Sequence, residues 1–269
     1  MPELVLNHNP YLLFQTSPSP MGLYARQKWL GQTASPSWRH DFEAAVRRCR
    51  AGQKSNGLWH GSSLETIQRL FDLHLTVRDA DPDIDRALDA LLAAVLSAGA
   101  NKARRRVAAN RLAGLPFAPG RWMEVVGPAT VFLAAIFGRD QHADVVELIG
   151  RLNDGLLGRR PEALPHAAGH NGLRAFVVLQ NAVELPATRL LVAWMARRQT
   201  TRGDWGRAIP FFQGLNALAH LDLQEARHQC ARGFDLLVAT QNPDGSWGTS
   251  QREACSFLAI HALRNQGMI

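Results

Sequence analysis

Apolar residues recur at helical spacing along most of the chain, and the segments between these runs are rich in glycine and proline. The spacing predicts helices over residues 21–31, 37–52, 62–76, 83–98, 122–138, 142–157, 170–184, 186–199, 207–221, 223–240 and 249–265. Residues 4–15 are expected to form one more helix. The sequence therefore predicts an all-α protein.

The predicted helices alternate between two kinds. Helices that follow a turn carry few charges, whereas helices that end in Gln carry stripes of Arg, Glu and Asp. This alternation predicts an (α/α)6 toroid, a single domain over residues 1–269 in which six inner helices are surrounded by about six outer ones. A superhelical solenoid is the alternative. Closure is favoured because residues 4–15 and the helix at 249–265 each lack a partner and can complete one another.

A short motif recurs where an outer helix meets an inner one. QKSNGLW runs from Gln53 to Trp59, QTTRGDW from Gln199 to Trp205, and QNPDGSW from Gln241 to Trp247. Each copy has helical patterns on both sides, so the repeating unit is helix, Gln, glycine turn, Trp, helix. A Gln amide can satisfy backbone groups at a helix end, and a Trp ring can cover the joint. We interpret the motif as architectural.

The order of Gln, a Gly-rich turn and Trp-Gly, as in Gln199 to Gly206 and Gln241 to Gly248, resembles the QW repeat of the squalene-hopene cyclase and protein prenyltransferase superfamily. The resemblance implies an (α/α)6 toroid with an isoprenoid or polyene ligand in its centre. The DxDD acid motif of hopene-type cyclases is not reproduced, because Asp83-Ile-Asp85 is followed by Arg86. These two aspartates start a predicted outer helix, where they are expected to cap it. The zinc-ligand spacing of prenyltransferases has no counterpart.

Composition narrows the class of protein. With 46% hydrophobic and 20% charged residues the chain is an ordinary globular protein. Its start has no cationic leader, and no apolar run approaches the ~20 residues that cross a bilayer, so we expect a cytoplasmic protein. The net charge of +7 is densest at residues 101–111, but no nucleic-acid-binding motif accompanies it. We expect no nucleic-acid partner, a solvated basic surface, and three buried free thiols.

In a toroid the inner helices all start at one end, the mouth of the ring. Aromatic groups there would shape an apolar ligand, and helix N-termini with arginines would favour an anionic one. The alternative is that these N-termini are capped internally and the arginines face water. The residues expected to bind substrate are Tyr24, His60, Trp122, Glu124, His170, Arg207, Phe211, Phe212 and Arg252.

Two carboxylates occupy equivalent inner positions, six residues past a repeat Trp: Glu65 and Glu253. If they point inward, burial would raise a pKa and allow acid/base catalysis, so we predict these two as the catalytic residues. The alternative is that each interacts with its own helix dipole. His74, His220 and His261 recur fourteen or fifteen residues past the same tryptophans, near the far end of the inner helices. They suggest either a metal site or contacts with helix C-termini, and we favour the latter, with no metal and no required cofactor.

An insertion at about residues 100–121 combines a predicted basic helix with the loop LAGLPFAPGRW. It is expected to be a lid in which Phe117 and Trp122 cover the ligand, although protein docking or peripheral contact with an anionic membrane are alternatives. His166 and His170, either side of Gly169, are expected in a loop.

Two functions remain open. The first is a terpenoid-cyclase-like enzyme that binds an apolar, anionic isoprenoid or polyene and cyclises or rearranges it by acid/base catalysis. The second is a non-catalytic toroid that binds a lipid or a protein partner. A carbohydrate-active barrel is less favoured, because the chain has only two Tyr residues. The sequence does not indicate an oligomeric state.

Overall fold

The computed structural model describes residues 4–269, and these residues form an all-α structure of twelve α-helices and five short 3-10 helices, without a strand. The α-helices are α1 (Pro20–Lys28), α2 (Pro36–Arg50), α3 (Ser63–Thr76), α4 (Pro82–Leu96), α5 (Ala100–Arg104), α6 (Trp122–Ile136), α7 (Ala143–Leu157), α8 (His166–Phe176), α9 (Pro186–Ala196), α10 (Phe211–Leu218), α11 (Gln224–Ala239) and α12 (Arg252–Asn265). The 3-10 helices are Leu12–Phe14, Gln32–Ala34, Ala109–Leu112, Pro161–Ala163 and Ala182–Glu184. None of the helices in this part of the chain is long and apolar enough to span a membrane.

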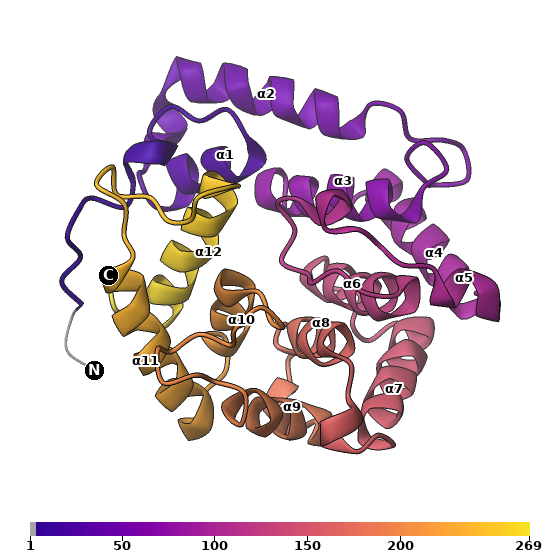
Figure 1. The fold of residues 1–269 in the computed structure, drawn as a ribbon. Coiled ribbons are helices and arrows are strands. Elements are labelled where there is room, and N and C mark those ends of the chain that lie inside the picture. The colour runs from indigo at the N-terminus through magenta and orange to yellow at the C-terminus, as the bar shows by residue number, and fades with distance from the viewer. Residues whose placement is uncertain (1–3) are drawn as a thin grey trace.

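The helices form two concentric layers (Figure 1). The inner layer consists of α1, α3, α6, α8, α10 and α12, and the outer layer of α2, α4, α7, α9 and α11. Each inner helix contacts the next one in the series, and α12 contacts α1, so the inner ring is closed. The predicted (α/α)6 toroid is confirmed, and the open solenoid is excluded.

The sixth outer position is filled by residues 4–15, but not by the predicted helix. These residues form no α-helix: a bend at 7–8 and a turn at 10–11 precede the 3-10 helix Leu12–Phe14. Leu4 N donates to Met268 O at 3.1 Å and Asn7 Nδ2 to Val238 O at 3.0 Å, so the segment lies along the C-terminal ends of α11 and α12. The prediction of a helix was wrong because asparagine side chains compete for local backbone groups here, as Asn9 Oδ1 does for Tyr11 N.

The three repeat glutamines make the same pair of hydrogen bonds. In each, Nε2 donates to the glycine carbonyl four residues on and to a carbonyl of the next outer element. The acceptor pairs are Gly57 and Asp83 for Gln53, Gly203 and Gln229 for Gln199, and Gly245 and His8 for Gln241, with N···O distances of 2.8–3.1 Å. The motif is therefore a joint that ties each outer element to the following one.

The turn glycines permit this joint. Gly203 has φ +95°, and a Cβ there would lie 2.3 Å from Arg232 O on α11. Gly245 has φ +82°, and its Cβ would lie 1.9 Å from Asn9 O. A larger residue is excluded both by backbone conformation and by the close approach of the next outer element. The repeat tryptophans, Trp59, Trp205 and Trp247, are at most 2% exposed and form part of the core.

Two sequence predictions about local structure were wrong, one for His166 and His170 and one for the basic insertion. Residues 166–176 form α8, so His166 and His170 lie in a helix and not in a loop. Gly169 allows α8 to pack closely against α9, because a Cβ at this position would lie 2.9 Å from the Trp194 ring. The basic insertion contains only the five-residue α5 and a 3-10 turn, after which residues 113–121 enter the ring. We call residues 113–121 the plug loop.

Candidate functional site

All six inner helices, with the residues directly after α8 and α10, line a central cavity of about 110 Å³. Aromatic rings form much of its wall, and polar groups gather toward the C-terminal ends of the helices. The lining residues are Tyr24, Phe71, His74, Leu75, Phe132, Ile136, Arg174, Val178, Asn216, His220, Phe257, Leu258 and His261. None of them is acidic.

Arg174 brings a positive charge into this cavity. Its side chain comes from α8, is 5% exposed, and stacks with Cζ 4.8 Å from the centre of the Phe132 ring. Nη1 donates to Asn216 Oδ1 at 2.7 Å, whereas the buried Nε has no partner. Burial lowers the pKa of Arg174 to about 9, so the guanidinium stays charged at neutral pH.

A second guanidinium, that of Arg78, stacks on a residue of the cavity wall without itself lining the cavity. Arg78 follows α3 with φ +67°, and its Cζ lies 4.7 Å from the centre of the Tyr24 ring. Its Nε and Nη2 atoms are buried without hydrogen-bond partners. Among residues 4–269 neither Arg78 nor Arg174 forms an ion pair.

The three histidines that recur in the sequence meet here. The His220 and His261 rings lie 5.3 Å apart, and His74 Nδ1 and His220 Nε2 are buried without partners. Burial, with the charge of Arg174, lowers the pKa of His74 and His261 to about 4 and the pKa of His220 well below its usual value. The histidines are therefore neutral at pH 7. The described residues contain no group of three or more His, Cys, Asp or Glu side chains placed to hold a metal ion.

The plug loop packs against the wall of the cavity. Phe117 is 3% exposed and packs edge-on against Phe132, with ring centres 5.6 Å apart. Asn171 on α8 holds the loop, because Ala118 N donates to its Oδ1 at 2.7 Å and its Nδ2 donates to Ala118 O at 2.9 Å. Trp122 does not cover the cavity in this structure. It lies at the rim, where Lys102 Nζ sits 4.5 Å from its ring centre.

Outside the plug loop, a mouth groove of about 550 Å³ runs between the N-termini of α6, α8 and α10. Arg106, Arg121, Glu124, His166 and Arg207 contribute its polar side chains. The arginines are exposed, and Glu124 is engaged in capping, since its Oε2 accepts from Arg121 N at 2.8 Å. Of the two arginines predicted to bind substrate, Arg207 lies in this groove and Arg252 does not, and the arginines that line the groove face water.

A second depression, which we call the acidic slot, has a volume of about 340 Å³ and lies among α1, α3, α12 and the start of the plug loop. Asp72 and Glu253 provide its carboxylates, and apolar groups such as Met21 and Ala254 provide most of the rest.

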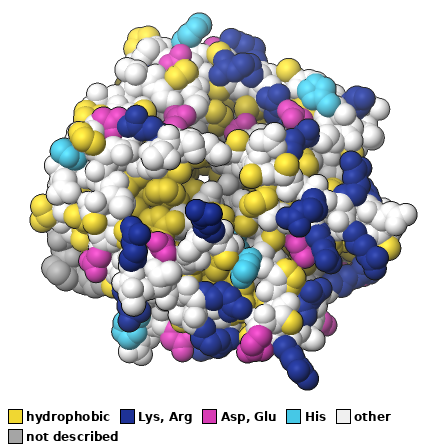
Figure 2. Space-filling model, in the orientation of Figure 1, with side chains coloured by type: hydrophobic (Ala, Val, Ile, Leu, Met, Phe, Trp, Pro, Cys, Tyr) yellow, Lys and Arg dark blue, Asp and Glu magenta, His cyan; other side chains and the backbone are white. Residues whose placement is uncertain are grey.

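Figure 2 shows one face of the molecule with a hollow lined by hydrophobic side chains and with basic side chains gathered on the side of α5 and α7.

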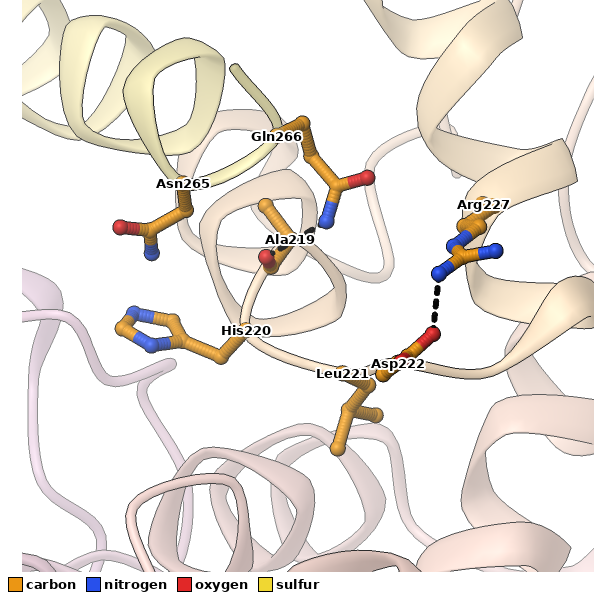
Figure 3. A pocket seen from close by; sticks show the side chains of 7 residues that line it. All are labelled: Ala219, His220, Leu221, Asp222, Arg227, Asn265 and Gln266. Atoms are coloured by element: carbon orange, nitrogen blue, oxygen red, sulfur yellow. Dashed lines mark hydrogen bonds and ion pairs between the residues drawn. The ribbon is translucent and has the colours of Figure 1, made fainter.

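At the opposite end of the ring, a far-end pocket of about 540 Å³ lies beyond the C-termini of α10 and α12 (Figure 3). His220 lines both this pocket and the central cavity. Asn265, also on the pocket wall, lies 3.3 Å from His261 Nδ1. The polar end of the central cavity is thus adjacent to an open pocket, which the ion pair of Arg227 with Asp222 borders.

The structure does not bring the two predicted catalytic carboxylates together in the central cavity. Glu65 lies in the first turn of α3 and pairs with Arg69, with Oε1 3.2 Å from Nε. Glu253 lines the acidic slot and accepts hydrogen bonds from Ser17 Oγ and, at 2.7 Å, from Ser19 Oγ.

The predicted binding residues are spread over several places. Tyr24 lines the central cavity, Arg207 and Glu124 the mouth groove, and Arg252 the acidic slot, where it pairs with Asp244. His170 is fully buried in α8, with Nδ1 3.0 Å from Asn171 Oδ1, and burial lowers its pKa to about 4. His60 is exposed, while Phe211 and Phe212 pack on each other at the start of α10 with ring centres 5.1 Å apart. The central cavity is not lined by His60, His170, Phe211 or Phe212.

The residues that sequence reasoning missed are Arg174, Arg78, Asn216 and Asp72. A usable signal was present for three of them, because a charged or amide side chain interrupts an otherwise apolar inner helix in GLRAFVV, GLNALAH and LFDLHL.

Asp83 and Asp85 lie in the first turn of outer helix α4, as predicted, although Asp81 is the N-cap. Cys49 and Cys230 are buried free thiols, and Cys255 is half-buried.

No family model matches the sequence, and no curated protein matches it at a significant level. Solved structures do resemble it. The type II terpene cyclase MstE from Scytonema, in its apo form, matches 97% of this chain and 90% of its own at a TM-score of 0.57 and 12% identity. A variant of that enzyme in complex with its substrate, geranylgeranyl dihydroxybenzoate, matches 97% of this chain and 88% of its own, at a TM-score of 0.54 and 12% identity. A protein from Actinoplanes matches 98% of this chain and 92% of its own, at a TM-score of 0.55 and 15% identity. The chain has a terpene cyclase-like fold.

Proposed function

We propose that the chain is a terpenoid-cyclase-like enzyme. It binds an isoprenoid or polyene with an anionic head group in its central cavity, and it cyclises or rearranges this substrate by acid/base catalysis. The observation that carries the proposal is the buried guanidinium of Arg174 in a largely apolar and aromatic cavity without a carboxylate, with the guanidinium of Arg78 stacked on the cavity residue Tyr24.

The arginines indicate the charge of the ligand. A buried cation is costly unless it is paired, and the cavity wall supplies no negative charge. Arg174 Nε and Arg78 Nε and Nη2 are donors without acceptors. A carboxylate or phosphate at this end of the cavity would satisfy these donors and neutralise the charge.

The aromatic wall indicates the rest of the ligand. Tyr24, Phe71, Phe132 and Phe257 present ring surface to the cavity, and such surface accommodates an apolar chain and stabilises a developing carbocation. The MstE ligand, geranylgeranyl dihydroxybenzoate, combines an isoprenoid chain with a benzoate head. A ligand of this class has the two properties that the cavity requires.

The roles of Glu65 and Glu253 remain predictions. Glu253 lies on the acidic slot and can contact a ligand there, whereas Glu65 is tied to Arg69. Glu65→Gln and Glu253→Gln each preserve shape and remove an acid. Loss of turnover with retained ligand binding would support the catalytic assignment, and unchanged turnover would dismiss it.

The anionic head group is tested with a matched pair of ligands. Geranylgeranyl dihydroxybenzoate and its methyl ester differ in the charge of the head, and their affinities are measured by isothermal titration calorimetry. We expect the acid to bind more tightly than the ester, and Arg174→Gln to weaken binding of the acid by about 30-fold or more, because a buried charge partner is lost. Arg151→Gln, an exposed change on α7, is the control. Equal affinity of the wild-type protein for acid and ester would refute the proposal.

Binding without catalysis is the second candidate, and the same cavity favours it in one respect. No acid lines the central cavity, so the cavity wall itself supplies no proton donor. Chromatographic separation and NMR spectroscopy of the ligand recovered after incubation decide between the two. Recovery of a rearranged isomer supports the enzyme, and recovery of unchanged ligand supports a lipid-binding protein.

A further inference from the structure

Asn216 is an amide at a position where a carboxylate of the same shape would fit. It lies on inner helix α10, is 1% exposed, and lines the central cavity. Arg174 Nη1 donates to Asn216 Oδ1 at 2.7 Å. Because a guanidinium only donates hydrogen bonds, this contact requires the amide oxygen to face Arg174. An aspartate would place an ionised oxygen there and form a buried ion pair. The chain has a neutral acceptor instead, which orients the guanidinium without neutralising it.

The other side of the same amide fixes the state of His261. With its oxygen toward Arg174, Asn216 directs Nδ2 toward Leu258 O and His261 Nδ1, each at 3.3 Å. An amide nitrogen only donates, so His261 Nδ1 accepts and carries no proton. A protonated imidazole would turn a second donor toward the amide. Burial and the charge of Arg174 act in the same direction, since they lower the pKa of His261 to about 4.

The cavity wall therefore carries one positive charge. Among the described residues that line it, Arg174 is the one charged at pH 7, because the three histidines are neutral. No carboxylate on this wall balances the charge. A ligand with one negative charge would make the filled cavity neutral. A neutral ligand would leave the cation unpaired, and a diphosphate would bring negative charges that the wall does not compensate.

The free edge of the guanidinium indicates the shape of the anion. Asn216 occupies Nη1, whereas Arg174 Nε is buried without a partner. Nε and Nη2 form one edge of the planar guanidinium, with two parallel N–H bonds. This edge matches the two oxygens of a carboxylate in a bidentate contact. By holding Nη1, Asn216 leaves this edge for a ligand.

We propose that Asn216 makes the central cavity selective for a substrate with a single carboxylate. The inference rests on the proposed function, and it narrows the anionic head group to a monoanion. Asn216 acts through Arg174 and is a positioning residue. It orients the guanidinium, leaves its charge for the ligand, and keeps the neighbouring imidazole of His261 neutral. An aspartate at this position would cancel the charge and shift the preference to a ligand with a neutral head.

The test exchanges the amide for a carboxylate of the same shape. Asn216→Asp is compared with Asn181→Asp, an exposed change before the 3-10 helix Ala182–Glu184. Isothermal titration calorimetry measures the affinity for geranylgeranyl dihydroxybenzoate, its methyl ester and geranylgeranyl diphosphate. We expect the wild type and Asn181→Asp to bind the acid most tightly. Asn216→Asp should bind the acid about 30-fold or more weakly than the wild type, and the ester at least as tightly as the wild type does.

Three results would overturn the proposal. One is an unchanged preference for the acid over the ester in Asn216→Asp. Another is an equal loss of affinity for both ligands, which would show that Asn216 has a structural role only. The third is tighter binding of the diphosphate than of the acid by the wild-type protein.

A measurement without ligand separates this inference from the proposed function. Failure of the wild-type protein to bind any of the three ligands would count against the proposed function, whereas urea denaturation decides whether residue 216 controls the charge at Arg174. We expect Asn216→Asp to raise the urea midpoint in the wild-type background, because the new carboxylate pairs with Arg174. In an Arg174→Gln background it should lower the midpoint, because the carboxylate is buried without a cation. Equal shifts in both backgrounds would overturn the assigned role of Asn216.

Discussion

Arg174 is a charge that the protein itself does not neutralise. Its guanidinium is buried, its hydrogen-bond partner is the amide of Asn216, and its nearest ring is Phe132. Residues kept in such a state usually serve a ligand, because the fold alone would be more stable without them. The sequence hinted at this site only through a charged residue in an apolar helix, since periodicity places a residue on the inner face but cannot reveal which charges lack partners.

Removal of the Arg174 charge together with its partner Asn216 should therefore stabilise the ligand-free protein. Arg174→Met combined with Asn216→Leu deletes the buried cation and its amide partner, which also contacts Leu258 O and His261 Nδ1. We expect the free energy of unfolding in urea to rise, because the cost of the buried unpaired charge exceeds that of the lost amide hydrogen bonds. The double variant should also lose binding of the anionic ligand. A marked decrease in stability would show that the guanidinium is needed by the fold itself.

The buried histidines predict sensitivity to acid. The folded-state pKa values of His74, His170 and His261 are lowered to about 4, so between pH 6.5 and 4 the unfolded chain takes up protons that the folded state does not. The free energy of unfolding is therefore expected to fall as the pH is lowered from 6.5 to 4. Asp72, with a raised pKa, acts in the opposite direction, but it is one group against several.

Urea denaturation at pH 7.5 and pH 5 measures this slope. We expect His261→Gln to make the loss of stability between the two pH values smaller, since one group that takes up a proton only on unfolding is removed. Replacement of the exposed His142 by Gln should leave the slope unchanged. An equal slope for His261→Gln would mean that His261 titrates normally in the folded protein.

At the scale of the elements, hydrophobic periodicity located most helices, and the repeat located the joints between layers. The errors arise where tertiary contacts decide the local structure. Gly169 suggested a loop, yet in α8 it provides room for Trp194. Residues 4–15 have an apolar pattern, but they form hydrogen bonds with the ends of α11 and α12 and do not form an α-helix. Neither contact is visible in the local sequence.

The glutamine joints should have a measurable effect on stability. Gln199→Ala leaves Gly203 O and Gln229 O without their amide donor. We expect the free energy of unfolding to fall by about 1–3 kcal/mol, as measured in urea. Gln141→Ala, at an exposed position before α7, should change it by less than about 0.5 kcal/mol. Similar values for the two variants would indicate that the repeated glutamines do not connect the outer elements.

At the scale of the whole molecule, the ring is closed by segments from opposite ends of the chain. Gln241 Nε2 donates to His8 O at 2.9 Å, and Gln241 Oε1 accepts from His8 N at 3.0 Å. The third glutamine joint therefore has the N-terminal segment as its outer element. The ring also closes through the contact of α1 with α12, and both of these helices line the central cavity and the acidic slot.

Gln241→Ala should loosen this closure locally. We expect faster amide hydrogen exchange in residues 4–15, with the exchange of α6 and α8 unchanged, because the lost bonds tie only the N-terminal segment. Gln199→Ala is the matched comparison and should leave residues 4–15 as protected as in the wild type. Uniformly faster exchange across the ring in Gln241→Ala would indicate global destabilisation and contradict a local closure.

The central claim is that the ring holds an anionic isoprenoid with its head at Arg174, and a crystal structure with geranylgeranyl dihydroxybenzoate tests it most directly. We predict the carboxylate within hydrogen-bond distance of Arg174 and the chain along Tyr24 and Phe257. A carboxylate bound instead by Arg121 and Arg207 in the mouth groove, with the central cavity unchanged, would contradict the account.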